Sequence, residues 1–541
     1  MNTEPNRSTT CALLLDEGNL VPRWQYEALN AAIAAGLVVS IVVHGRAPNR
    51  RRQLRKHAVY YALAAVSRAT MRQLSHVDVS PLIPPAAPVI SFDIELEGIW
   101  QRIPDSVTRQ FVGLECVLKF GMGLLRDPDS IPVAGGVVSY HHGDPECFRG
   151  RPAGYYELES KSEVVGVIVQ RLSNLLDGGE ILAAGFSQVR PWSYSKTLGG
   201  VLDAGVPLLA IAVQRGLVGS IQAPETLGPN YRLPANFDVV KFIAMMGWAK
   251  ARRVVYGLAR EKQWRVGRYS GPWDPTLRNQ LRVQDCEVLP LPRGATFVAD
   301  PVGPLVDGVL CEVLNARSGL GEIHRWNSVG WTRIDHKLGG GHTSYPFLVN
   351  TPFGCALFPE VAATRSPALV PFSPTSNETL DAIPLSGLQS ERLIDATLFQ
   401  RENHWFLFGG RAGAEERELR LWVANDVQGP YHEHPDSPVC IDPRRARMAG
   451  PLFMKGGVLY RPGQDCAKDF GSQVVLHAIE EITPSRYIER PSGSLSMIGV
   501  KGPHTATPAD DSLWVDFYTE RWSAAAGLRR LRARTKRLAS K

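Results

Sequence analysis

The chain has 541 residues, which exceeds the size of one ordinary domain and predicts two or three domains. Its 44% hydrophobic and 8% aromatic residues are enough for a sizeable core, which excludes an intrinsically disordered protein. The net charge of +7 is compatible with anionic substrates such as nucleotide sugars or folate, but it does not require a nucleic-acid partner, and we expect none.

The eight cysteines are scattered along the chain without a CxxC pair or the spacing of a zinc site. We therefore expect reduced thiols and no metal. The first ten residues lack an apolar signal core, and the apolar stretch at residues 31–43 is too short to span a bilayer. These features predict a soluble, cytoplasmic protein.

The first part of the chain alternates strand-like and helix-like segments. An apolar run at residues 11–15 is followed by a helical pattern at 24–35 and a β-branched run at 37–43, and this strand–helix–strand unit predicts a parallel sheet. We expect an α/β domain here. Further helices are expected at 50–74 and 106–113, and further strands at 89–92, 137–140 and 164–172.

Polar residues follow the strand that is expected at 137–140. Ser139 and His141 are two residues apart, so both point to one face of the strand and His142 points to the other. Asp177 follows the next strand, where a carboxylate can meet His141 beyond the end of the sheet. A histidine oriented by a carboxylate can act as a base or as a hydrogen-bond donor. The alternatives are histidines that leave a strand for solvent and an aspartate that only forms a turn.

The run SYHHGDPECFRG at residues 139–150 resembles the formyltransferase signature Asn-x-His-x-Ser-x-Leu-x-x-x-Arg-Gly. Residues 166–182, with VQRL and LDGGEIL, resemble the strand and the Asp-x-Gly-Glu/Asp loop of that family, and the similarity covers about residues 10–220. The resemblance implies a Rossmann-like fold and transfer of a formyl group from 10-formyltetrahydrofolate to a primary amine. By the same resemblance, His141 and Asp177 are catalytic. The residues assigned to substrate and cofactor binding are His142, Asp144, Arg149 and Gly150.

The chain departs from this signature at Ser139, which stands where the family has asparagine. In the family, the asparagine and the histidine stabilise the oxyanion that forms when the amine attacks the formyl carbon. A serine hydroxyl donates one hydrogen bond with a shorter reach, and loss of an oxyanion donor costs about 10²–10³ in rate. Either Ser139 or His142 takes over this role, or the chemistry differs, or the domain is inactive.

Prolines and glycines gather at residues 220–237, where we place a domain boundary, and a helix is expected at 239–261. Beyond this helix, short apolar runs alternate with Asp-Gly and Gly-Gly pairs, which is typical of β-hairpins. Similar apolar runs recur at a spacing of roughly 50 residues, about one propeller blade. They are centred near Phe297, Tyr345, Leu398 and Phe453.

This recurrence predicts an all-β, five-bladed propeller. Its motifs, from FVADP at residues 297–301 to RPGQD at 461–465, resemble the five-bladed propeller at the N-terminus of plant glucosamine inositolphosphorylceramide transferases, which is also found fused to formyltransferase-like modules. The resemblance covers roughly residues 260–500 and implies a fold similar to that of arabinanase and fructosidase-type glycosidases. We divide the chain into the α/β domain at 1–225, a linker and helix at 226–262, the propeller at 263–522 and a basic tail at 523–541.

A propeller of this kind can hold acids on its innermost strands, and glycosidases need two carboxylates that flank the scissile bond. We expect a central pocket that binds a sugar without hydrolysing it. The alternatives are a glycosidase and acids that only cap turns at blade edges. The candidate acids are Asp300, Glu312, Glu360 and Asp395, and the candidate donors are Arg447, Arg461 and Gln464. Trp331, Tyr345, Trp405 and Trp422 are candidates either for stacking on sugar faces or for the core.

Two functions remain open. The first is an enzyme that N-formylates an amino sugar or a similar amine in polysaccharide or natural-product biosynthesis, and the second is a carbohydrate-binding or glycosidase-like propeller protein with an altered formyltransferase domain. His141 and Asp177 favour the first and Ser139 favours the second; we predict the enzyme. For the basic tail at 523–541 we expect a solvated helix face, or else weak contact with an anionic membrane surface.

Overall fold

The computed structural model of the protein describes residues 8–46, 54–217, 227–303, 305, 307–339, 341–361 and 366–531. The chain forms two compact units, residues 1–250 and 251–541. The division falls inside helix α7, Asn236–Ala259, within the segment at 226–262 that the sequence predicts to be a linker and a helix. Residues 532–541 of the expected basic tail lie outside the described residues.

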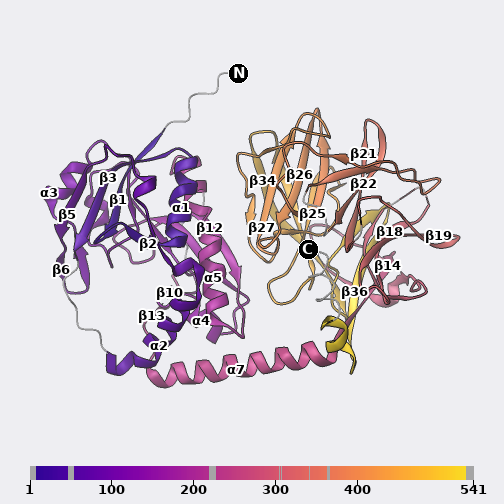
Figure 1. Cartoon of the computed structure of the whole chain (residues 1–541), viewed down its shortest axis with the longest axis horizontal. Helices are drawn as coiled ribbons and strands as arrows, with labels where there is room; N and C mark the ends of the chain where they lie inside the picture. The colour runs from indigo at the N-terminus through magenta and orange to yellow at the C-terminus, as the bar shows by residue number, and fades with distance from the viewer. Residues whose placement is uncertain are drawn as a thin grey trace. The chain divides into compact units, whose positions relative to one another are not determined.

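A seven-stranded sheet forms the centre of the first unit, in the order β12-β11-β9-β8-β1-β3-β5 (Figure 1). The five strands from β9 to β5 are parallel. β11 pairs antiparallel with β9, and β12 pairs antiparallel with β11, so the predicted parallel sheet is extended at one edge by a hairpin. The strands are β1 Thr9–Asp16, β3 Leu37–Arg46, β5 Val89–Asp93, β8 Cys116–Lys119, β9 Val137–His141, β11 Val164–Arg171 and β12 Glu180–Gln188.

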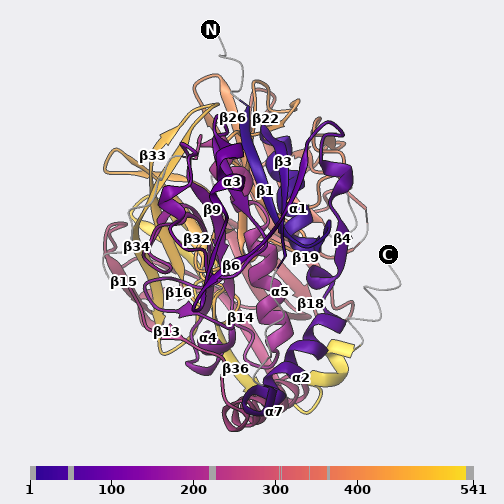
Figure 2. The same ribbon diagram turned by 90° about the vertical axis from the view of Figure 1, so that its left-hand side faces the viewer.

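Helices α1, α5 and α6 pack together and cover one face of this sheet (Figure 2). α5 begins after Ser193, whose hydroxyl accepts a hydrogen bond from the backbone N–H of Lys196, and Pro207 precedes α6. The segment Tyr194–Gln214 is long and apolar enough to cross a membrane, but 56% of its 18-residue window is buried inside the protein. The helices are α1 Arg23–Ala34, α2 Leu54–Thr70, α3 Asp105–Thr108, α4 Tyr155–Glu159, α5 Tyr194–Gly205 and α6 Leu208–Gln214.

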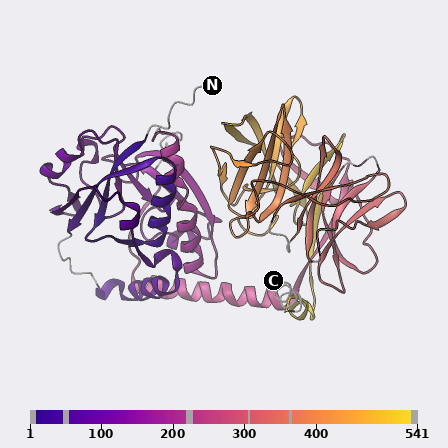
Figure 3. The ribbon, with the colours of Figure 1, turned by 45° about the horizontal axis from the view of Figure 1, so that its top comes forward.

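The second unit consists of five sheets, which are the blades of a propeller (Figure 3); their strands pair antiparallel except β15, which pairs parallel with β34. Blade 1 contains β17 Ala295–Val302, β18 Val309–Asn315, β19 Gly321–Asn327 and β20 Gly330–Arg333. Blade 2 contains β21 Thr343–Thr351, β22 Gly354–Val361, β23 Ala368–Pro371 and β24 Ile383–Pro384. Blade 3 contains β25 Leu393–Arg401, β26 His404–Arg411, β27 Glu418–Ala424 and β28 His432–Glu433.

The last two blades join the two ends of the unit. In blade 5, β14 from the start of the unit pairs with β36 from its end, from Arg260 opposite Trp522 to Tyr269 opposite Leu513. Blade 4 contains β30 Arg447–Met448, β32 Val458–Gln464, β33 Val474–Ile482, β34 Tyr487–Ile498 and β15 Arg278–Arg282. Blade 5 contains β35 Ala506–Ala509, β36 Ser512–Trp522, β14 Arg260–Tyr269 and β16 Cys286–Val288.

Five hydrophobic clusters hold neighbouring blades together, one at each junction. The junction between blades 5 and 1, for example, buries Val266 and Trp514 of blade 5 against Val298 of blade 1. Because this last junction is packed like the other four, the blades form a closed ring. The predicted fold class, a Rossmann-like α/β domain followed by a five-bladed β-propeller, is confirmed.

Candidate functional site

His141 and Asp177 meet at the carboxyl end of β9. Nδ1 of His141 lies 3.4 Å from Oδ1 of Asp177, and Nε2 of the same ring lies 3.2 Å from the carbonyl oxygen of Phe148. Both ring nitrogens therefore face oxygen acceptors. Asp177 sits in the loop between β11 and β12 with a left-handed φ of 53°, and its other carboxylate oxygen accepts a hydrogen bond from the backbone N–H of Gly150.

Ser139 lies on the same face of β9 as His141, as the alternation of a strand requires. The antiparallel register places Gln170 of β11 directly opposite Ser139, so the two side chains share that face. Gln170 is only 1% exposed, and its Oε1 atom has no hydrogen-bond partner among the described residues. Gln170 cannot be recognised as a site residue from the sequence, because only the pairing of β9 with β11 brings it beside Ser139.

The loop after β9 is tightly built around the histidine. A Cβ atom at Gly143 would lie 2.6 Å from the Phe148 carbonyl oxygen and 2.9 Å from Nε2 of His141, so only glycine fits at this position. Arg149 donates hydrogen bonds to the carbonyls of Gly228 and Leu176, at 2.6 and 3.2 Å. Arg149 and Gly150, which the resemblance assigns to substrate and cofactor binding, therefore position the loop that carries Asp177.

Two residues of the predicted site make other contacts. His142 packs edge-on against Trp24 with ring centroids 5.0 Å apart, and burial together with the charge of His141 lowers the pKa of His142 to about 4. It lies on the opposite side from Ser139, so the hypothesis that His142 replaces the family's asparagine is corrected. Asp144 accepts a hydrogen bond from the backbone N–H of Glu146 at 3.0 Å and shapes the turn.

The innermost strands of three successive propeller blades carry the same irregularity. Asp300 on β17, Tyr345 on β21 and Asp395 on β25 have left-handed φ values of 49°, 45° and 48°. At each of them the register with the next strand shifts, as in a β-bulge. Non-glycine residues rarely adopt this conformation, and such strain gathers at functional sites.

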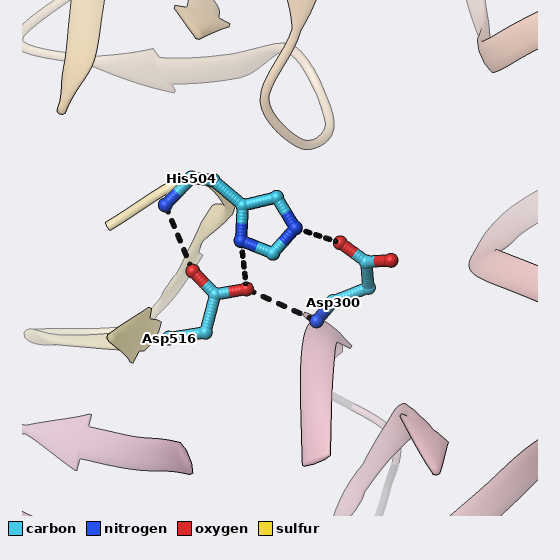
Figure 4. A group of neighbouring side chains, drawn as sticks. All are labelled: Asp300, His504 and Asp516. Atoms are coloured by element: carbon cyan, nitrogen blue, oxygen red, sulfur yellow. Dashed lines mark hydrogen bonds and ion pairs between the residues drawn. The ribbon is translucent and has the colours of Figure 1, made fainter. Parts of the chain in front are cut away.

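Asp300 joins a buried hub with His504 and Asp516 (Figure 4). Nε2 of His504 lies 2.9 Å from Oδ1 of Asp300, and Nδ1 lies 2.7 Å from Oδ2 of Asp516. Asp516 also accepts hydrogen bonds from the backbone N–H groups of Asp300, His504 and Thr505.

The hub is an ion network. Burial opposes a charge on His504, but the carboxylates of Asp516 and Asp300 outweigh it and raise the pKa of His504 to about 10. Burial would raise the pKa of Asp300, but His504 lowers it to about 2. The three residues also offer ligand atoms within 4.8 Å of one another, which makes them a candidate metal set. Because each ring nitrogen faces a different carboxylate, a protonated His504 explains the arrangement by itself.

Asp395 forms a second group beside the hub. Its Oδ2 atom lies 2.5 Å from Nε of Arg447 and 3.1 Å from the amide nitrogen of Gln464, and its backbone N–H donates to Glu360 at 3.4 Å. Burial and the charge of Asp395 raise the pKa of Glu360 to about 8. Glu312 lies 3.5 Å from Nε2 of His342, and burial, followed by the charge of Asp300, raises its pKa well above the usual value.

Arg461 does not belong to this group. It is fully buried and forms a bidentate ion pair with Glu489, at 2.6 and 2.7 Å. It is three residues from Gln464 on β32, and side chains at that spacing point to opposite faces of a strand. The prediction of Arg461 as a donor at the pocket is therefore corrected. Tyr345, Trp405 and Trp422 are buried in the core between blades 2 and 3, so they pack the propeller and do not present open faces to a sugar.

Comparison with known proteins bears mainly on the propeller. A family model described as the N-terminal region of glucosamine inositolphosphorylceramide transferase 1 matches residues 317–502, which is less than half of the chain. Glucosamine inositolphosphorylceramide transferase 1 of Oryza sativa subsp. japonica is 35% identical over 157 residues, which cover 28% of this chain and 21% of the relative. The chain thus spans about a fifth of the length of this relative. The resemblance to this transferase region is confirmed for the matched residues.

Solved structures align with each unit at low identity. Glycinamide ribonucleotide transformylase 1 from Symbiobacterium toebii is 14% identical, covers 41% of this chain and 95% of its own, and has a TM-score of 0.28. An exo-beta-1,3-galactanase from Clostridium thermocellum is 10% identical, covers 36% of this chain and 47% of its own, and has a TM-score of 0.26. Because these TM-scores are low, we identify the fold of each unit from the order of its strands.

Proposed function

We propose that the α/β unit is an N-formyltransferase that moves a formyl group from 10-formyltetrahydrofolate to the primary amine of an amino sugar. The observation that carries the proposal is the pairing of His141 with Asp177 at the carboxyl end of β9, next to Ser139 and Gln170. In open α/β sheets, ligands bind at this edge. No metal is needed for the reaction, and we propose none.

The folate carries the formyl group on a nitrogen. The amine forms a new C–N bond to the formyl carbon and loses one proton, the C–N bond to the folate breaks, and the folate nitrogen gains a proton. His141 donates the hydrogen bond of Nε2 to the formyl oxygen as negative charge develops there. Asp177 accepts from Nδ1–H and so holds the ring in its orientation. In the structure Nε2 faces the Phe148 carbonyl, and the formyl oxygen would take the place of this acceptor when the folate binds.

The second oxyanion donor is shared between two strands. The hydroxyl of Ser139 makes only a weak 3.5 Å hydrogen bond, to the carbonyl of Lys119. The buried amide of Gln170 stands directly opposite Ser139, and its Nε2 carries the N–H groups that an oxyanion needs, whereas its Oε1, which has no partner among the described atoms, can only accept. A side-chain amide is the group that the family's asparagine supplies. We infer that Gln170 provides it here from the neighbouring strand, with Ser139 leaving room for it.

An amino sugar is the acceptor that the relatives favour. The relatives of the propeller are named for glucosamine, which carries a primary amine on a sugar. A polysaccharide or glycolipid precursor in the cytoplasm would meet this description.

Calorimetric titration of a stable 10-formyltetrahydrofolate analogue into the full chain tests the donor site. We expect saturable binding to the wild type and to Asp177→Asn, because this substitution disturbs the orientation of His141 more than the volume of the site. Absence of binding at high protein concentration would exclude folate-dependent transfer and leave the propeller as the functional part.

A second function is favoured by the acids of the propeller. We propose that Asp300, Asp395, Glu312 and Glu360 mark a site that binds a sugar without hydrolysing it. Asp300 already accepts hydrogen bonds from Thr505 and from the backbone of Tyr345 in addition to its ion pair with His504, so it is a poor base or nucleophile. Asp395 is held by Arg447 and Gln464. Glycan-array binding of the chain, compared with that of Glu360→Gln, tests this site; release of free sugar would contradict it.

A further inference from the structure

Helix α7 exposes an apolar ridge along its whole length. Trp248 is 69% exposed, Phe237 68% and Leu258 59%, which are unusually high values for side chains of this kind. At 1.5 Å per residue, the 24-residue helix is about 36 Å long. The ridge residues follow one another at intervals of three or four, so they lie on one side of the helix. They are Phe237, Val240, Ala244, Trp248, Ala251, Val255 and Leu258.

The opposite side of the helix is where it packs. Val239 and Phe242 are buried, and the ring of Phe242 stacks on that of Tyr155 with centroids 4.1 Å apart. Met245 and Met246 pack against the same cluster. The ridge is therefore separate from the face by which α7 packs into the core.

Basic residues lie beside the ridge. At about 100° per residue, Lys241 and Arg252 border one side of the ridge, and both are exposed. The ammonium of Lys241 lies 4.3 Å from the ring centroid of Phe237. The only acid on the helix, Asp238, points away from the ridge. An apolar stripe bordered by lysine and arginine is typical of helices that lie in a membrane interface.

The basic end of the chain attaches to the same helix. The Arg530 guanidinium donates hydrogen bonds to the carbonyls of Tyr256 in α7 and of Arg260, the first residue of β14, at 3.3 and 2.6 Å. Leu528 and Leu531 beside it are 51% and 59% exposed. The sequence continues with further basic residues that lie outside the described part of the chain: Arg532, Arg534, Lys536, Arg537 and Lys541.

We propose that α7 binds the surface of an anionic lipid membrane, with its ridge among the headgroups and its basic residues against lipid phosphates. A second copy of the helix is the less favourable occupant, because pairing two ridges would bring basic rows together with only one acid on each helix. Membrane binding does not depend on formyl transfer, and it would hold the catalytic unit near a lipid-linked substrate.

Vesicle cosedimentation of the full chain tests the proposal, with vesicles of phosphatidylcholine alone or with about 30% phosphatidylserine. We expect binding only to the anionic vesicles, and its loss on raising NaCl from ~50 to ~500 mM. The double variant Trp248→Glu/Val255→Glu should bind at least about tenfold more weakly. Arg252→Glu should weaken binding by about fivefold or more.

Val329→Glu is the matched control, because Val329 is 92% exposed on a propeller turn. It should bind as the wild type does, and unchanged circular dichroism of all variants would show that they fold. Absence of binding to anionic vesicles, or equal binding of the Trp248→Glu/Val255→Glu variant, would overturn the proposal. So would a wild-type dimer that this variant turns into a monomer, because the ridge would then be a contact between two copies.

Discussion

The substitution Asp516→Asn tests whether the propeller hub holds its ring together. Asp516 is fully buried on β36 and accepts three backbone hydrogen bonds in addition to its 2.7 Å ion pair with His504. The amide keeps the shape of the side chain but removes its charge, and it presents N–H hydrogens where donors now point. The imidazolium of His504 would remain paired with Asp300 alone.

Removing one partner of a buried ion pair costs about 3–5 kcal/mol. The hub links β17 of blade 1 to β35 and β36 of blade 5, so this loss falls on the junction that closes the ring. At about 1.4 kcal/mol for each factor of ten, exchange of the protected amides in these strands should become about 10² to 4 × 10³ times faster.

Hydrogen exchange with mass spectrometry on the full chain measures this change. Peptides from β1 and β3 serve as the internal control, and Asp511→Asn, which changes an exposed acid in the preceding turn, serves as the control variant. If amide exchange in β17 and β36 became less than about tenfold faster, the claim that the hub closes the propeller ring would be refuted.

A change of pH and two substitutions test other parts of the molecule. The pKa of His504 is about 10 in the folded protein and about 6.5 in the unfolded chain, so its contribution to stability is complete below pH 6.5 and is lost as the pH rises through 10. The urea midpoint of the propeller should therefore fall between pH 7 and 10.5, and a midpoint that does not change with pH would contradict the ion network. Gln170→Leu should lower kcat by about 10²-fold with the Kd for the folate analogue unchanged, and an unaltered kcat would exclude it as a donor. Gly143→Ala, with its Cβ 2.9 Å from Nε2 of His141, should also lower kcat and should not alter exchange in β1.

Much of the α/β unit follows from its sequence, because local patterns determine it. The strand–helix–strand period gives the parallel core, and the end of β9 presents His141 where the alternation places it. The position of Asp177 also follows from its place after a strand. Gln170 does not, because its role depends on the antiparallel pairing of β11 with β9, which no local pattern specifies.

In the propeller, the spacing of apolar runs gives the number of blades but not which side chains meet at the centre. Arg461 and Gln464 look equivalent in the motif RPGQD, yet they lie on opposite faces of β32. Asp516 is 216 residues from Asp300 in the chain and meets it only because blade 5 closes the ring. A signal was present in LWVDF at residues 513–517, where a single acid interrupts an apolar strand, since such an acid is rarely buried without a partner.

The central claim is formyl transfer at His141, and amine-dependent release of tetrahydrofolate from 10-formyltetrahydrofolate tests it most directly. The assay uses a panel of nucleotide-linked amino sugars with the wild type, His141→Ala and the control His76→Ala, which changes an exposed histidine of the same unit. We predict release that requires an amine in the wild type and the control, and a loss of at least about 10²-fold in His141→Ala. Release that is unaffected by His141→Ala, or no release from any amine by a chain that binds the folate analogue, would contradict the claim.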